Sequence, residues 1–148
     1  MGNSLVTIAY SCYFERPMAK SLFLLLADDD LDDCNMFEKA LKEIPINTNL
    51  KTVYDGDDLL KELSYNTDDL PDLIFLDLNM PRINGVECLH IIKTSEELKN
   101  IPVVIFSTSI HETLARKLID NGAKECIRKP SSFQELKNVI SNSLSELQ

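Results

Sequence analysis

Short apolar runs of strand length alternate along this chain with segments whose apolar residues recur at helical spacing. The five strand candidates are residues 22–27, 50–54, 73–76, 103–106 and 125–127. The first, third and fourth of these runs are apolar throughout, which is typical of strands covered on both faces. Between the strands, apolar side chains recur every three or four residues, as on one face of a helix. This alternation predicts a parallel sheet with helices on both sides.

Each predicted helix is preceded by a residue that can cap its first turn. The cap candidates are Asp30, Asp55, Asn84, Ser109 and Ser132. After the last three, a glutamate follows at the third position, which is the spacing of a capping box. The chain therefore predicts an α/β domain at residues 21–148, a (βα)5 doubly wound sheet of five parallel strands. Residues 1–20 are interpreted as an arm outside the core, or as the result of an upstream start codon with Met18 as the true initiator.

The acidic charge of the chain limits its partners. It has 15 Lys+Arg against 24 Asp+Glu, a formal net charge of −9, and a pI near 4.6. Nucleic acids and anionic lipids attract basic surfaces, so we expect neither nucleic-acid nor membrane binding. No apolar run approaches the roughly 20 residues that span a bilayer. The four widely spaced cysteines favour a reducing cytoplasm.

Polar side chains follow four of the predicted strands where each strand ends. Asp28 and Asp29 follow the first strand, Asp77 the third, Ser107 the fourth and Lys129 the fifth. The carboxyl ends of parallel strands meet along one end of a sheet, so these side chains should lie together. Two carboxylates ~4 Å apart repel each other by about 4 kcal/mol at an effective dielectric near 20. A divalent cation offsets that repulsion, and the pattern predicts a Mg²⁺ site suited to phosphoryl transfer onto a carboxylate.

The run of aspartates after the first strand also has a plainer explanation. Aspartate is a common N-cap, and acidic residues in a first turn interact favourably with the helix dipole. Taken alone, such a run is more typical of a capped helix start than of a metal site. We expect both uses here, with Asp28 and Asp29 at the metal and with Asp30, Asp32 and Asp33 at the start of the helix.

The motifs at the strand ends resemble those of the receiver domains of two-component response regulators, the class that includes the bacterial chemotaxis receiver. The resemblance covers roughly residues 22–147. Its motifs are Asp28-Asp29, residues 76–81 (LDLNMP) with Asn84-Gly85, residues 102–107 (PVVIFS), and Lys129-Pro130. It implies the flavodoxin-like receiver fold. Because only one helix is predicted after Pro130, we expect a stand-alone regulator that signals by protein–protein interaction.

The resemblance implies a role for each residue at the strand ends. Asp77 would accept a phosphoryl group from a sensor histidine kinase or a histidine phosphotransfer protein. Ser107 would be the switch hydroxyl, and Lys129 would pair with a phosphoryl oxygen. The bond between Lys129 and Pro130 would be cis. The implied Mg²⁺ ligands are Asp29 and Asp77 by side chain, Asp28 through water, and Asn79 by its backbone carbonyl.

One face departs from the family pattern. The family has a switch aromatic three residues before the lysine, where this chain has Cys126, which has no ring to swing between exposed and buried positions. The face formed by the fourth predicted helix, the fifth strand and the last helix is the family's usual partner or dimer surface, so the resemblance implies either an output protein or a homodimer there. Its basic residues can be interpreted as solvated charges or as a docking site for an acidic partner. They are Arg116, Lys117, Lys124 and Arg128.

Two other functions stay open as alternatives. Phosphatases with an aspartate nucleophile resemble this pattern, but they have a second acid two residues after the nucleophile, where this chain has Asn79. A constitutive interaction domain that is never phosphorylated would not need the intact set of strand-end residues, which are Asp28, Asp29, Asp77, Ser107 and Lys129. The sequence therefore predicts a signalling protein and not an enzyme.

Overall fold

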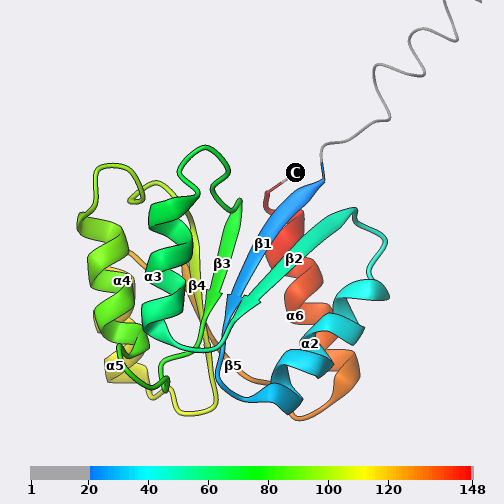
Figure 1. Ribbon diagram of the computed structural model, residues 1–148. Coiled ribbons are helices and arrows are strands. Elements are labelled where there is room, and N and C mark those ends of the chain that lie inside the picture. The colour runs from blue at the N-terminus through cyan, green and yellow to red at the C-terminus, as the bar shows by residue number, and fades with distance from the viewer. Residues whose placement is uncertain (1–20, 148) are drawn as a thin grey trace, which may run out of the picture.

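The computed structural model describes residues 21–147, in which five strands and five helices alternate (Figure 1). The strands are β1 (Leu22–Ala27), β2 (Thr48–Val53), β3 (Leu73–Leu76), β4 (Val103–Ser107) and β5 (Glu125–Arg128). The helices are α2 (Leu31–Lys42), α3 (Gly56–Tyr65), α4 (Gly85–Thr94), α5 (Glu112–Asp120) and α6 (Phe133–Ser145). The arm predicted at residues 1–20, including the alternative start at Met18, lies outside the described residues. Within residues 21–147, no helix has the length and apolar character needed to cross a bilayer.

All five strands pair in parallel, in the order β2-β1-β3-β4-β5. The chain runs from β1 outward to β2 and then returns to place β3 on the other side of β1. The strand order therefore reverses between β1 and β3, and ligands of such sheets bind beyond the carboxyl ends of the strands at that point. The predicted doubly wound (βα)5 fold is confirmed.

Helices cover both faces of the sheet, with α2 and α6 on one side and α3, α4 and α5 on the other (Figure 1). Side chains alternate along β1, so Leu24 and Leu26 join the first core and Leu25 joins the second. The core under α2 and α6 contains three phenylalanine rings in edge-to-face contact, with centroids 4.9, 5.9 and 6.2 Å apart. These apolar layers are what hold the strand ends in fixed positions.

Four of the five predicted helix caps are present. The side chains of Asp30, Asp55, Asn84 and Ser132 each accept a hydrogen bond from the backbone N–H three residues later, at 2.7 to 3.1 Å. These bonds satisfy amide groups that have no partner within the helix.

The fifth predicted cap is wrong. Helix α5 begins at Glu112, and its cap is His111, whose Nδ1 accepts a hydrogen bond from the Leu114 N–H at 3.2 Å. The burial of Ile110 in the core under α3, α4 and α5 explains the difference. An apolar residue just before a cap fixes where the chain enters the helix, and this places Ser109 too far upstream to reach the first turn.

Candidate functional site

The strand ends bring Asp77, Ser107 and Lys129 to the same end of the sheet, which we call the carboxyl end. The hydrogen-bond ladder of the sheet continues into these residues, since Asp77 N donates to Ala27 O at 2.9 Å and Lys129 N donates to Ser107 O at 2.9 Å. Asp28 N likewise donates to the last residue of β2 at 3.0 Å. Their backbones are therefore as rigidly placed as the strands themselves.

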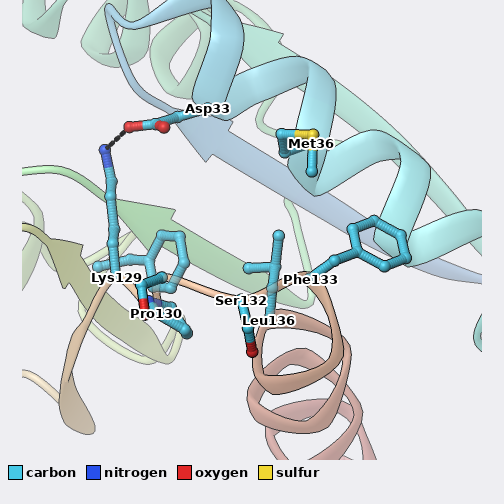
Figure 2. A pocket seen from close by; sticks show the side chains of 9 residues that line it. Asp33, Met36, Lys129, Pro130, Ser132, Phe133 and Leu136 are labelled. Atoms are coloured by element: carbon cyan, nitrogen blue, oxygen red, sulfur yellow. Dashed lines mark hydrogen bonds and ion pairs between the residues drawn. The ribbon is translucent and has the colours of Figure 1, made fainter.

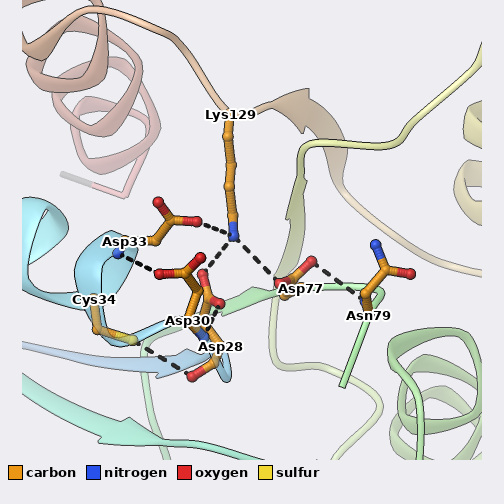
Figure 3. Close-up of polar contacts among 7 residues, drawn as sticks. All are labelled: Asp28, Asp30, Asp33, Cys34, Asp77, Asn79 and Lys129. Carbon is orange, nitrogen blue, oxygen red and sulfur yellow. Dashed lines mark hydrogen bonds and ion pairs between the residues drawn. The ribbon is translucent and has the colours of Figure 1, made fainter. Parts of the chain in front are cut away.

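Lys129 lies at the centre of this site, with its ammonium group among three carboxylates (Figure 3). Its Nζ is 2.7 Å from Asp28 Oδ2, 2.8 Å from Asp33 Oδ2 and 3.3 Å from Asp77 Oδ2. Burial by itself lowers the pKa of Lys129. The hydrogen bonds to Asp28 and Asp33 and the charges of Asp28 and Asp77 outweigh that effect and raise the pKa above its ordinary value. The lysine is therefore a permanent cation at neutral pH.

Negative charge exceeds positive charge at this site. One carboxylate oxygen from each of Asp28, Asp29 and Asp77 lies within 4.8 Å of the others. Asp28 and Asp77 are buried and Asp29 is exposed. Burial raises the pKa of Asp28 to about 6, although the contacts with Lys129 and the Asp30 N–H oppose the shift. Closely spaced oxygen ligands with one side open to solvent are the donor set that Mg²⁺ prefers, so the residues present fit this ion.

The loop after β3 fixes the carboxylate of Asp77 from the side opposite Lys129. Asn79 N donates to Asp77 Oδ1 at 3.4 Å, and Gly85 N donates to Leu78 O at 2.9 Å. A Cβ atom on Gly85 would lie 2.2 Å from the backbone oxygen of Asp77. Only glycine therefore lets α4 start this close to Asp77.

Ser107 ends β4 with its side chain fully buried, whereas Thr108 is exposed. The Ser107 Oγ has no hydrogen-bond partner among the described residues. A buried hydroxyl without a partner is costly and uncommon in folded proteins. The arrangement suits a hydroxyl that finds its acceptor only when another group enters the site.

The sequence interpretation missed Asp33 as part of this site. It was assigned only to the start of a helix, and its N–H does bond to the cap Asp30, but its carboxylate also pairs with Lys129. A usable signal existed, because helical side chains lean toward the N-terminus of their helix. Helix α2 follows β1 after a short connection, so side chains in its first turn lean toward the carboxyl end of the sheet.

The peptide bond that follows Lys129 differs from the expectation. Among the described residues there is no cis peptide bond, so the Lys129–Pro130 bond is trans and the implied cis bond is wrong. Cys126 is half-buried, with its Sγ 3.8 Å from Ala115 O on α5. The Cys126 side chain therefore packs against α5 where the family has an aromatic ring.

Three of the four basic residues around β5 have local partners. Arg116 pairs with Glu112 at 2.6 Å and Lys124 with Glu146 at 2.9 Å, while Arg128 donates to a backbone oxygen at 2.7 Å. These pairs favour the interpretation of scattered solvated charge over a docking site for an acidic partner.

Comparison with known proteins places this geometry in context. The family model described as the response regulator receiver domain matches residues 24–141. A probable methanogenesis regulatory protein, FilR2 of Methanothrix harundinacea, is 30% identical over 120 residues, covering 79% of this chain and 77% of that protein. The sensor histidine kinase CheAY of Helicobacter pylori is 28% identical over 121 residues, but the chain spans 15% of that protein's length.

Two solved structures share the fold closely. The Mn²⁺-bound form of response regulator Rcp1 superimposes with a TM-score of 0.75 at 29% identity, covering 84% of this chain and 92% of that one. The phosphorylated cyanobacterial phytochrome response regulator RcpA gives a TM-score of 0.77 at 31% identity, covering 84% and 91%. Both structures resemble this chain over nearly all of its described residues.

Proposed function

This chain belongs to the response regulator receiver domain family, which acts in two-component signalling, and we propose that Asp77 is its phosphoacceptor. The observation that carries the proposal is the pairing of the buried Asp77 carboxylate with the Lys129 ammonium, beside two further aspartates. Phosphoryl transfer needs a nucleophile, a fixed cation and a binding site for a second cation. These residues would supply all three.

In the proposed reaction, a carboxylate oxygen of Asp77 attacks the phosphorus of a phosphohistidine. A P–O bond forms while the P–N bond breaks, and the released imidazole takes up a proton. Lys129 neutralises charge on the phosphoryl oxygens from a position that the fold has already fixed. The unpaired Ser107 hydroxyl donates to a phosphoryl oxygen and draws the loop after β4 inward, so that the chemical step changes the surface.

The reaction is proposed to depend on Mg²⁺. When bound, the ion supplies positive charge that offsets the carboxylates and the phosphoryl oxygens. Asp29 and Asp77 would hold it by their side chains, Asp28 through water, and Asn79 by its backbone carbonyl. The cluster of carboxylate oxygens within 4.8 Å supports this assignment, as does the Mn²⁺ bound to the related Rcp1.

The proposed phosphodonor is a sensor histidine kinase or a histidine phosphotransfer protein in the cytoplasm. The similarity to part of the kinase CheAY supports a partner of this class. The phosphorylated protein would signal by binding an output protein, or by forming a homodimer, through the face of α5, β5 and α6. Neither nucleic acid nor membrane is a proposed partner, since the chain has a net charge of −9.

The experiment is incubation with acetyl phosphate and Mg²⁺, followed by intact mass measurement. We expect one phosphoryl group per chain, absent from Asp77→Asn and absent when EDTA replaces Mg²⁺. Asp72→Asn is the matched control, because Asp72 directly precedes β3 whereas Asp77 directly follows it, so the two aspartates lie at opposite ends of the same strand. Labelling that survives Asp77→Asn would refute the assignment. Repeated turnover of a phosphate ester would instead indicate the phosphatase alternative.

A further inference from the structure

Asp33 makes a contact at this site that the motifs do not account for. Its Oδ2 lies 2.8 Å from Lys129 Nζ, closer than the 3.3 Å contact made by Asp77 (Figure 3). The two residues are 96 positions apart in the sequence and come from α2 and from the loop after β5. The contact is therefore a product of the fold and not of helix capping.

Hydrogen bonds at the start of α2 fix the position of Asp33 (Figure 3). Asp30 N donates to Asp28 Oδ1 at 3.0 Å, and Asp33 N donates to Asp30 Oδ1 at 3.1 Å. Asp28 and Asp33 then both accept from the Lys129 ammonium. These contacts form a closed ring, so Asp33 meets the lysine from a prepared position.

Carboxylates surround the Lys129 ammonium, which donates hydrogen bonds to Asp33 and Asp77 and forms an ion pair with Asp28. An ammonium group has three N–H donors, and Asp28, Asp33 and Asp77 lie at 2.7, 2.8 and 3.3 Å. A phosphoryl oxygen can therefore bind Lys129 fully only if one of these carboxylates gives up its place. The outcome depends on which of them can leave most readily.

Asp33 is the partner that can leave with the smallest penalty. The Asp28 side chain is 1% exposed, so losing its cation would strand a buried charge, whereas the Asp33 side chain is 38% exposed. Asp33 also lines a cavity of about 180 Å³ together with Lys129 and Ser131, where water can solvate a released carboxylate (Figure 2). Asp77 stays in place because it is the proposed phosphoacceptor.

We propose that Asp33 is an exchangeable partner of Lys129, which holds the ammonium before phosphorylation and releases it to a phosphoryl oxygen afterwards. Asp33 is then a positioning residue that opposes the phosphorylated state, by competing for Lys129 and by placing a like charge beside the phosphoryl group. This inference rests on the proposed function and adds a regulatory role to the same site.

The test is a titration with beryllium trifluoride, a tetrahedral mimic of a phosphoryl group, in the presence of Mg²⁺, followed by fluorine NMR. Asp33→Asn is compared with Asp32→Asn, because Asp32 lies in the same turn and is exposed. Both variants remove one charge from the same helix start. We expect Asp33→Asn to bind the mimic about threefold to tenfold more tightly than Asp32→Asn, a range typical of losing one partly exposed competing ion pair. Asp33→Glu keeps the carboxylate and should return the affinity toward that of the wild type.

Two further measurements separate this role from a structural one. The melting temperature reports any loss of helix stability, and the Mg²⁺ affinity without the mimic should change equally in Asp33→Asn and Asp32→Asn. Affinity for the mimic that is unchanged or weaker in Asp33→Asn, with the wild type binding normally, would overturn the exchange role alone. Failure of the wild-type protein to bind the mimic with Mg²⁺ would overturn the proposed function and the role of Asp33 with it.

Discussion

Lys93 and Lys129 lie at opposite ends of the same sheet and are paired in different ways. At the end where the strands begin, which we call the amino end, Lys93 Nζ donates to the backbone oxygens of Lys99 and Ile101 at 3.0 and 2.6 Å. Asp72, at the same end, accepts a backbone N–H of β1 at 2.8 Å. At the carboxyl end, Lys129 is surrounded by carboxylates only.

The difference separates groups that stabilise the fold from the groups to which we assign the proposed phosphoryl chemistry. An ammonium group that bonds to neutral backbone carbonyls satisfies those carbonyls, and it has no crowd of like charges around it. In a cluster where carboxylates outnumber the cation, the carboxylates repel one another and destabilise the folded state. A bound metal cation relieves that repulsion, so such a cluster favours metal binding. Substitutions at the amino end should therefore affect stability alone, and those at the carboxyl end should affect stability in a Mg²⁺-dependent way.

The largest expected effect comes from removing the two lysines in turn. Lys129→Met leaves the buried Asp28 and Asp77 without their cation, and the free energy of unfolding without Mg²⁺ should fall by about 3 kcal/mol. Lys93→Met leaves only neutral carbonyls without a donor, so its loss should be about 1 kcal/mol. Urea denaturation with EDTA and with Mg²⁺ measures both, and Mg²⁺ should restore stability only to Lys129→Met. Equal losses of unfolding free energy in the two variants, unchanged by Mg²⁺, would contradict the proposed difference between the two ends.

A smaller effect is expected from adding a methyl group to a glycine at each end. Gly122, at the amino end, has a φ of +107°, and a Cβ there would lie 2.8 Å from Lys93 Cγ. Gly122→Ala should lower the free energy of unfolding by about 1–2 kcal/mol and leave Mg²⁺ affinity unchanged. Gly85→Ala should weaken Mg²⁺ binding as well, because the new Cβ would displace the backbone of Asp77. Calorimetric Mg²⁺ titration distinguishes them, and a normal affinity in Gly85→Ala would count against the close approach.

The smallest effect on stability is expected from two buried serines. Ser107 and Ser143 each have a buried Oγ without a hydrogen-bond partner, but Ser143 lies in α6 away from the carboxylates. Replacing either with alanine should leave the free energy of unfolding unchanged or raise it by up to about 1 kcal/mol.

Function should distinguish these two variants. With beryllium trifluoride and Mg²⁺, hydrogen exchange in the loop after β4 should slow in Ser143→Ala as in the wild type, and should not slow in Ser107→Ala. If both variants respond alike, the unpaired hydroxyl of Ser107 has no switching role.

Much of the fold could be predicted because its signals are local. Continuous apolar runs identified β1, β3 and β4, and a polar side chain three residues before its partner identified four helix starts. The cap of α5 was the exception, since burial of Ile110 in a core built from distant segments decided where that helix begins. Local spacing cannot report a constraint that comes from packing.

The sequence by itself determined that carboxylates, a hydroxyl and a lysine follow the strands, and the parallel alternation was enough to predict that they meet. Only the tertiary structure decided which carboxylates pair with the lysine. The pairing of Asp33 with Lys129 joins residues 96 positions apart, and it depends on how α2 sits above β1 and how the loop after β5 turns toward it. Capping and periodicity act over a few residues, whereas an ion pair between distant segments is set by the packing of the layers that carry them.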